Sequence, residues 1–172
     1  RKRMPEYEYY YTHYLEGYEK AFLVSTGANL GIRETRRILG EYVLNAQDYE
    51  KRASFEDEIG RYCYPIDLHP LEPGAAKTKY EEDYTKGYGK GNSYGIPYRC
   101  LLPKNTENLL VAGRCISTSR EMNGSTRVMP CCFITGMAAG AAAAFSKDSN
   151  VRAVSVSSLR QELRKRGGYL PE

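Results

Sequence analysis

The order of apolar and polar positions predicts short strands at several points along the chain. Residues 21–24 form a brief apolar run, which is typical of a short strand. Residues 31–44 have a less regular pattern, and because glycine breaks helices we interpret them as two strands bent at Gly40. Residues 109–112 are continuously apolar and end at Gly113, as expected of a strand buried on both faces.

Helix-start signals follow the first strands. Asn45 with Asp48 resembles the beginning of a helix, and Ser54 with Asp57 resembles a second one. We therefore expect two short helices within residues 46–61.

The last third of the chain carries the longest helical patterns. Residues 127–146 are predicted to form a helix rich in small residues. A final helix is predicted over residues 157–166, with Leu159 and Leu163 on one face and Gly167 as its end.

The middle of the chain reads as irregular. Glycine and proline recur through residues 70–95, which predicts a loop. Residues 96–103 then form an extended piece, and Asn105 and Asn108 mark a turn.

Composition narrows the class of protein. With 172 residues, 41% hydrophobic and 27% charged, the chain can form a globular domain. The net charge of +4 is spread along the chain, which argues against a nucleic-acid surface. We interpret the apolar stretch 128–145 as a buried helix of a soluble protein, and we expect no membrane contact.

The cysteines and the first residues point to a cytoplasmic protein. Five cysteines without CxxC spacing argue against a disulfide framework and a zinc site, so no metal is expected. Residues 1–18 have no apolar core of a secretory signal. They carry six tyrosines, which suits a segment covering a neighbouring domain and, less well, stacking on a base or sugar.

One constellation has the pattern of a cofactor site. The predicted strand 109–112 ends at a glycine, and a loop then leads to a helix whose start carries little side-chain bulk. Ligands of open α/β sheets lie outside the carboxyl ends of strands, and helix amino termini attract anionic groups. Gly136 and Gly140 share one face and would allow close approach to the sheet. The pattern suits a flat, partly anionic cofactor, although tight packing alone would explain it equally well.

Several segments resemble, in family order, the carboxy-terminal part of the bacterial FAD-dependent oxidoreductases. They are residues 31–42, 64–69, 96–103, 108–116 and 124–144. The resemblance implies an α/β or α+β fold and FAD as the cofactor. It also implies the carboxy-terminal part of a two-domain flavoprotein fold without its amino-terminal dinucleotide-binding βαβ unit, since no Gly-x-Gly-x-x-Gly loop follows a strand here.

The resemblance divides the chain into three parts. Residues 1–20 would be the tyrosine-rich covering segment, residues 21–100 part of a substrate-binding domain, and residues 101–172 the end of the FAD-binding domain.

The family pattern also implies roles for particular residues. Gly113 and Arg114 would lie by the ribityl and diphosphate part of FAD, and the start of the following helix would lie near the pyrimidine edge of the flavin. The residues of that helix start are Arg127, Val128, Met129, Pro130, Cys131 and Cys132. Arg127 would stabilise the charge that reduced flavin develops at N1, and is thus a catalytic candidate.

Outside the flavin site, four residues are candidates for catalysis or substrate binding. His69, beside Asp67, could transfer a proton, although a structural role is also open. Arg33 and Arg36 could hold an anionic or polyhydroxylated substrate, or they could belong to an ion-pair network with nearby glutamates. Tyr98 could border the substrate or merely anchor the extended segment.

The adjacent thiols of Cys131 and Cys132 leave two interpretations. At a helix start their pKa would be lowered if they were exposed, which would allow a redox pair. Buried packing residues are the favoured alternative.

The functional expectation is an enzyme that passes a hydride from an organic substrate to FAD. The chain alone is expected to be inactive, with the remaining amino-terminal half of the same protein as its partner. An unpaired strand at residues 109–112 would also favour a homo-oligomer. The rival interpretations are a carbohydrate- or protein-binding module without redox function and, less favoured, a basic nucleic-acid binder.

Overall fold

The structure, a computed structural model, describes residues 3–34, 36–68 and 88–171. These residues form two compact units, Arg1–Ile32 and Arg33–Glu172, which are described separately. The three-part division expected from the sequence stays a prediction, and the predicted loop falls largely within residues 69–87, outside the described part.

The first unit contains one helix, α1, Met4–Tyr14. Pro5 occupies its first turn, where a missing N–H costs no hydrogen bond. No residue of α1 is buried, so its tyrosines are exposed within this unit. The predicted strand at 21–24 is wrong, because these residues have no regular structure. A strand requires a hydrogen-bonded neighbour, and no described residue pairs with this run.

The second unit is built on a small antiparallel sheet. Strands β1, Glu58–Tyr62, and β2, Tyr94–Pro97, pair with Tyr62 opposite Tyr94 and with an irregularity between Glu58 and Arg61. The helix predicted to begin at Ser54 is therefore wrong. Residues 58–62 pair with β2 as a strand and bury Ile59 in the core, and this pairing depends on a segment that lies far away in the sequence.

Helix α2, Ala46–Lys51, confirms the predicted start at Asn45. The Asn45 side chain accepts hydrogen bonds from the backbone N–H groups of Gln47, at 2.9 Å, and Asp48, at 3.3 Å. The Asp48 carboxylate in turn accepts from the Asn45 N–H at 3.0 Å. This reciprocal capping satisfies N–H groups that a helix start leaves unpaired.

The strand pair predicted for 31–44 is wrong. Only single bridges form there, between Gly40 and Pro103 and between Leu44 and Thr118. Gly40 lies against the Ser117 side chain, where an added Cβ would come within 2.7 Å of the Ser117 Cβ. The glycine therefore permits a close crossing of two chain segments and does not bend a strand.

The buried strand predicted for 109–112 is also wrong. These residues are extended but pair with no strand, and 46% of Leu109 is exposed. One hydrogen bond, from the Val111 N–H to the Leu101 carbonyl at 2.9 Å, ties the run to the end of the 3-10 helix Tyr98–Leu101. The self-association expected from this unpaired run stays a prediction.

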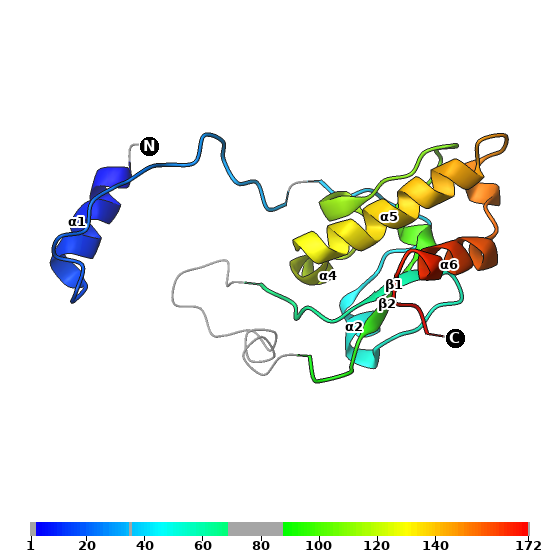
Figure 1. The fold of residues 1–172 in the computed structure, drawn as a ribbon, viewed down its shortest axis with the longest axis horizontal. Coiled ribbons are helices and arrows are strands. Elements are labelled where there is room, and N and C mark those ends of the chain that lie inside the picture. Colours follow the sequence, from blue (N-terminus) through cyan, green and yellow to red (C-terminus); the bar gives the residue numbers. More distant parts are fainter. Residues whose placement is uncertain (1–2, 35, 69–87, 172) are drawn as a thin grey trace. The chain divides into compact units, whose positions relative to one another are not determined.

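The described residues of the second unit form three further α-helices: α4, Arg120–Thr126; α5, Met129–Phe145; and α6, Val156–Lys165. Helices α5 and α6 lie side by side and both contact β1 (Figure 1). Leu159 and Leu163 are fully buried on α6, which confirms its predicted face. Short 3-10 helices, Gly113–Cys115 and Val151–Ala153, connect these elements.

The helix predicted for residues 127–146 is confirmed as α5. Within the described residues no single helix has the length and apolar content needed to cross a membrane. Helices α4 and α5 have that length and apolar content only when they are counted together, as a pair bent by 91°.

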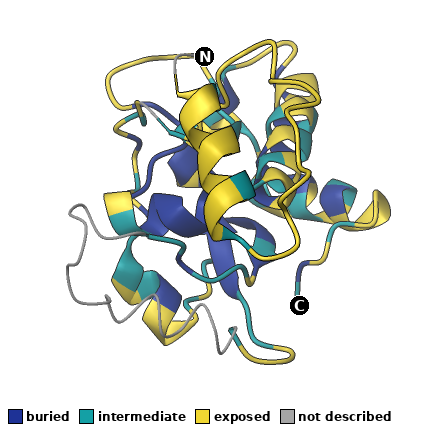
Figure 2. Ribbon diagram, turned by 90° about the vertical axis from the view of Figure 1, so that its left-hand side faces the viewer, coloured by how far each residue is buried: buried dark blue, intermediate teal, exposed yellow. Residues whose placement is uncertain are grey.

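The core surrounds the two strands, which are almost entirely buried (Figure 2). Tyr94, Ile59, Leu101 and Met122 are among its largest members. Helices packed on a small antiparallel sheet make the fold α+β, one of the two classes expected. The close approach expected at Gly136 and Gly140 is not observed, since an added Cβ at either glycine would meet no atom within 4 Å.

Candidate functional site

The candidate site is the corner at which α4 ends and α5 begins. Ser119 caps α4 by accepting a hydrogen bond from the Met122 N–H at 3.2 Å. Gly124 lets α4 press against the backbone at Asp67, because an added Cβ would lie 3.0 Å from the Asp67 carbonyl oxygen. Arg127 forms the corner itself, and Val128 is the residue before α5.

Arg127 is the most heavily bonded residue of this corner. Its Nη1 lies 2.5 Å from Glu34 Oε2, and its Nη2 donates to the Asp67 carbonyl at 2.9 Å. The Asp67 carboxylate lies 3.7 Å from the same Nη2 and also pairs with Arg33 at 3.0 Å. Arg33, Glu34, Asp67 and Arg127, here called the corner cluster, therefore alternate in charge.

The Arg127 side chain is largely buried, which limits its contact with a ligand. It is 11% exposed, and its Nε is buried without a hydrogen-bond partner among the described residues. Two carboxylates already face the guanidinium, so its charge is largely compensated inside the protein. This geometry suits a residue that positions the start of α5 better than one that contacts a ligand directly.

Gly113 and Arg114 come to the same corner from the preceding 3-10 helix. Gly113 has a φ of +86°, which favours glycine, and its N–H donates to the Thr135 hydroxyl at 3.0 Å. Arg114 is exposed, and its Nε donates to the Arg127 carbonyl at 3.1 Å. The residues predicted for the ribityl and diphosphate part of FAD are thus brought together with the predicted helix start.

The chain leaves room for a ligand at this place. An added Cβ at Gly113 would meet no atom within 4 Å, so its backbone borders open space. Met129 and Pro130 are exposed, Val128 and Cys132 are half-buried, and no side chain caps the amino terminus of α5. A positive helix end beside an exposed guanidinium suits a cofactor that carries phosphate groups, as FAD does.

The two thiols at the start of α5 are not activated. Cys131 is fully buried, and burial raises the pKa of its thiol. Burial also raises the pKa of Cys132, an effect that the nearby Arg114 opposes. Cys131 lies inside the protein, as the packing interpretation expects, while its contact with the cofactor stays a prediction.

The described candidates for substrate binding are not gathered at the start of α5. Tyr98 is buried and its hydroxyl donates to the Val151 carbonyl at 2.9 Å, which matches the anchoring alternative. Arg33 and Arg36 are exposed, the former within the corner cluster. His69 lies outside the described residues. Among the described residues no group of histidine, cysteine, aspartate and glutamate could hold a metal ion.

Two buried polar residues of the site were missed by sequence reasoning. Asn123 is fully buried and its amide donates to the Arg114 carbonyl at 3.0 Å. Thr135, also fully buried, binds the Gly113 N–H and donates to the Cys131 carbonyl at 2.9 Å. The sequence signal that could have found them is a polar residue at a helical position that faces the core, since a buried polar group needs a hydrogen-bond partner.

Comparison with known proteins gives one match. The family model described as FAD dependent oxidoreductase matches residues 1–163. No curated protein and no solved structure matches the chain. The match extends over the candidate corner and over the tyrosine-rich first unit. The chain belongs to the FAD-dependent oxidoreductase family, the redox flavoproteins whose cofactor is FAD.

Proposed function

We propose that this protein serves the oxidation of an organic substrate, in which a hydride passes to FAD and the electrons continue to an acceptor. The family match over residues 1–163 supports FAD as the cofactor of this reaction. When bound, FAD supplies a ring that accepts two electrons and a proton as a hydride. The protein's own residues bind and orient the cofactor and the substrate.

The flavin's phosphate and ribityl groups would lie at Gly113 and Arg114. The open space above Gly113 allows close approach of a ligand to the backbone. The Arg114 guanidinium presents paired donors that match phosphate oxygens. Val128, Met129 and Pro130 would border the ring from the start of α5, with Cys131 packed behind them.

Arg127 has a positioning role in this proposal. Its bonds to Glu34 and to the Asp67 carbonyl fix the corner from which α5 begins. Its carbonyl holds the Arg114 side chain through the 3.1 Å hydrogen bond. The helix dipole and the Arg114 guanidinium would add positive potential near the flavin.

An anionic or polyhydroxylated substrate would meet Arg33, in the corner cluster, and Arg36, both of which are exposed. His69 is retained as the candidate for proton transfer. The ADP half of FAD would be held by residues outside these 172, since the sequence contains no dinucleotide-binding glycine loop after a strand. Five free cysteines support a cytoplasmic location.

Flavin content and the visible spectrum test this proposal. We expect stoichiometric FAD in a longer chain that contains these residues, and weak or no binding by the 172 residues alone. Gly113→Val should reduce the flavin content of the longer chain, because the side chain would fill the open space and strain a φ of +86°. Gly17→Val, at a φ of +87° in the first unit, is the matched control. A colourless longer chain would contradict the proposal.

A further inference from the structure

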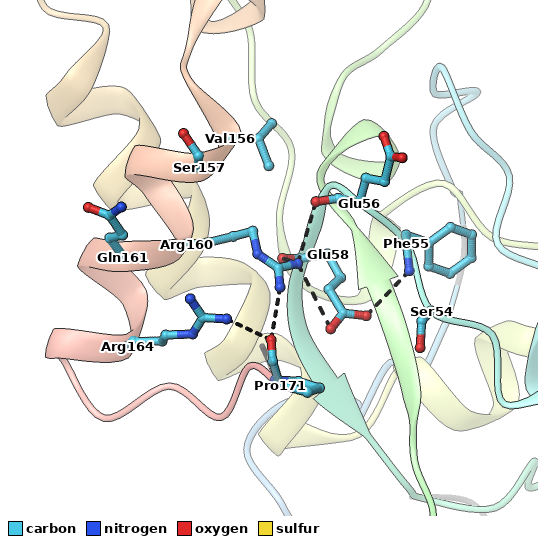
Figure 3. A pocket seen from close by; sticks show the side chains of 10 residues that line it. All are labelled: Ser54, Phe55, Glu56, Glu58, Val156, Ser157, Arg160, Gln161, Arg164 and Pro171. Atoms are coloured by element: carbon cyan, nitrogen blue, oxygen red, sulfur yellow. Dashed lines mark hydrogen bonds and ion pairs between the residues drawn. The ribbon is translucent and has the colours of Figure 1, made fainter.

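A cavity of about 680 Å³ lies between α6 and the segment that leads into β1 (Figure 3). Its walls are formed by residues 54–56, Glu58, one face of α6 and Pro171. None of the residues of the proposed flavin corner lines it.

Two guanidinium groups of α6 converge on one neutral oxygen at this cavity. Arg160 Nη2 donates to the Pro171 carbonyl at 3.0 Å, and Arg164 Nη2 donates to the same oxygen at 2.6 Å. The two arginines are four residues apart, and both point from α6 toward Pro171 in Figure 3. A carbonyl oxygen carries only a partial negative charge, whereas two guanidinium groups form stronger hydrogen bonds with the full negative charge of an oxyanion. The carbonyl oxygen occupies the place that an oxygen of a carboxylate would take.

The charged side chains that line the cavity balance one another. Glu58 is 3% exposed, and its Oε2 pairs with Arg61 at 3.0 Å while its Oε1 lies 3.9 Å from Arg160. Glu56 is exposed at the rim. Arg160 and Arg164 thus balance the two lining carboxylates, so the cavity repels neither a neutral nor a singly charged ligand.

The other walls are suited to an organic group. Phe55, Val156 and Pro171 supply apolar surface beside the arginines. We propose that Arg160 and Arg164 bind the carboxylate of a small organic monocarboxylate, which displaces the Pro171 carbonyl. Binding pockets for small molecules commonly combine apolar walls with a few convergent polar groups.

The displacement preserves the rest of the local structure. Arg160 Nη1 donates to the carbonyls of Glu56, at 3.4 Å, and Glu58, at 3.3 Å, and these bonds hold α6 to the entrance of β1. Arg164 Nε donates to the Leu170 carbonyl at 3.1 Å. Only the two bonds to Pro171 are exchanged, so ligand binding frees Pro171 while α6 remains in place.

Calorimetric titration of the 172-residue chain with acetate, propionate and benzoate tests the proposal, with the corresponding amides as uncharged controls. We expect saturable binding of at least one carboxylate and at least tenfold weaker binding of its amide. Arg164→Gln should weaken carboxylate binding about tenfold or more, because a charge-assisted pair of hydrogen bonds is lost. Arg166→Gln, on the same helix but paired with Glu162 outside the cavity, should leave binding unchanged.

Three outcomes overturn the proposal. They are the absence of saturable binding for all three carboxylates, equal binding by Arg164→Gln, and inorganic phosphate bound as tightly as the best carboxylate. The resonance of the Pro171 carbonyl carbon provides an independent measure, since this oxygen loses both guanidinium hydrogen bonds when the carboxylate binds. An unshifted resonance at saturation would contradict the displacement of Pro171. Far-ultraviolet circular dichroism of each variant verifies that the fold is retained.

Discussion

At the scale of single residues, the candidate site depends on how buried charges are paired. Arg127 and Arg33 both contact the Asp67 carboxylate, yet they lie in different surroundings. The Arg127 side chain is 11% exposed, whereas that of Arg33 is 62% exposed. An ion pair in water contributes little, while loss of one member of a buried pair leaves the other without compensation.

This contrast makes Arg127→Gln the informative substitution. We expect it to lower the free energy of unfolding by roughly 1–3 kcal/mol, because Glu34 and the Asp67 carbonyl lose their donor. Arg33→Gln is the matched control and should cost less than about 1 kcal/mol. Urea denaturation of both variants gives the two values. Equal losses would show that burial does not govern this cluster.

At the scale of elements, two glycines in neighbouring helices have opposite surroundings. Gly124, in α4, lies against the Asp67 backbone, which cannot move aside as a flexible side chain could. Gly136, in α5, borders open space although the sequence suggested close packing there. The helical pattern alone does not distinguish them, because the difference lies in what packs on each face.

Alanine at each position should therefore act in opposite directions. Gly124→Ala should destabilise the protein by about 1–3 kcal/mol, since its Cβ would lie 3.0 Å from the Asp67 carbonyl oxygen. Gly136→Ala should stabilise it by roughly 0.5–1 kcal/mol, because alanine is the better helix former. Thermal and urea unfolding measure both. Destabilisation by Gly136→Ala would mean that this face of α5 is covered.

At the scale of the whole molecule, the core contains many ionisable groups held in their neutral form. Burial raises the pKa of Cys100 and of Tyr98 to about 12 in each case. Burial also raises the pKa of Tyr94, which lies at the centre of the core. In the unfolded chain these groups lose their protons at lower pH, near 9 for the thiol and near 10 for the phenols.

The folded protein should consequently lose stability in alkali. Because of these groups the unfolded state binds fewer protons than the folded state above about pH 9, so their contribution to the free energy of unfolding should be constant below that value and fall as the pH approaches 12. Urea unfolding at several pH values measures the slope. Cys100→Ala should reduce the slope between about pH 9 and 12, whereas Cys63→Ala, at an exposed thiol, should not. Identical slopes would contradict the contribution of Cys100.

The elements that the sequence determined by itself are those encoded in neighbouring residues. Asn45 and Asp48 cap α2 through their own side chains, and Leu159 and Leu163 place one face of α6 toward the core. These signals act within one or two helical turns, so the rest of the molecule need not be known. The motifs of the family likewise indicated FAD, and the family match confirms it.

Only the tertiary structure decided the features that need a distant partner. Residues 109–112 are apolar enough for a strand, but a strand forms only where another strand offers hydrogen bonds, and β1 and β2 pair elsewhere. The action of Arg127 on the flavin stays a prediction, whereas its pairing with Glu34, 93 positions away, is a contact that only the fold creates. The physical reason is the same in both cases: long-range contacts select among several locally acceptable conformations and pairings, and the sequence pattern records only the local ones.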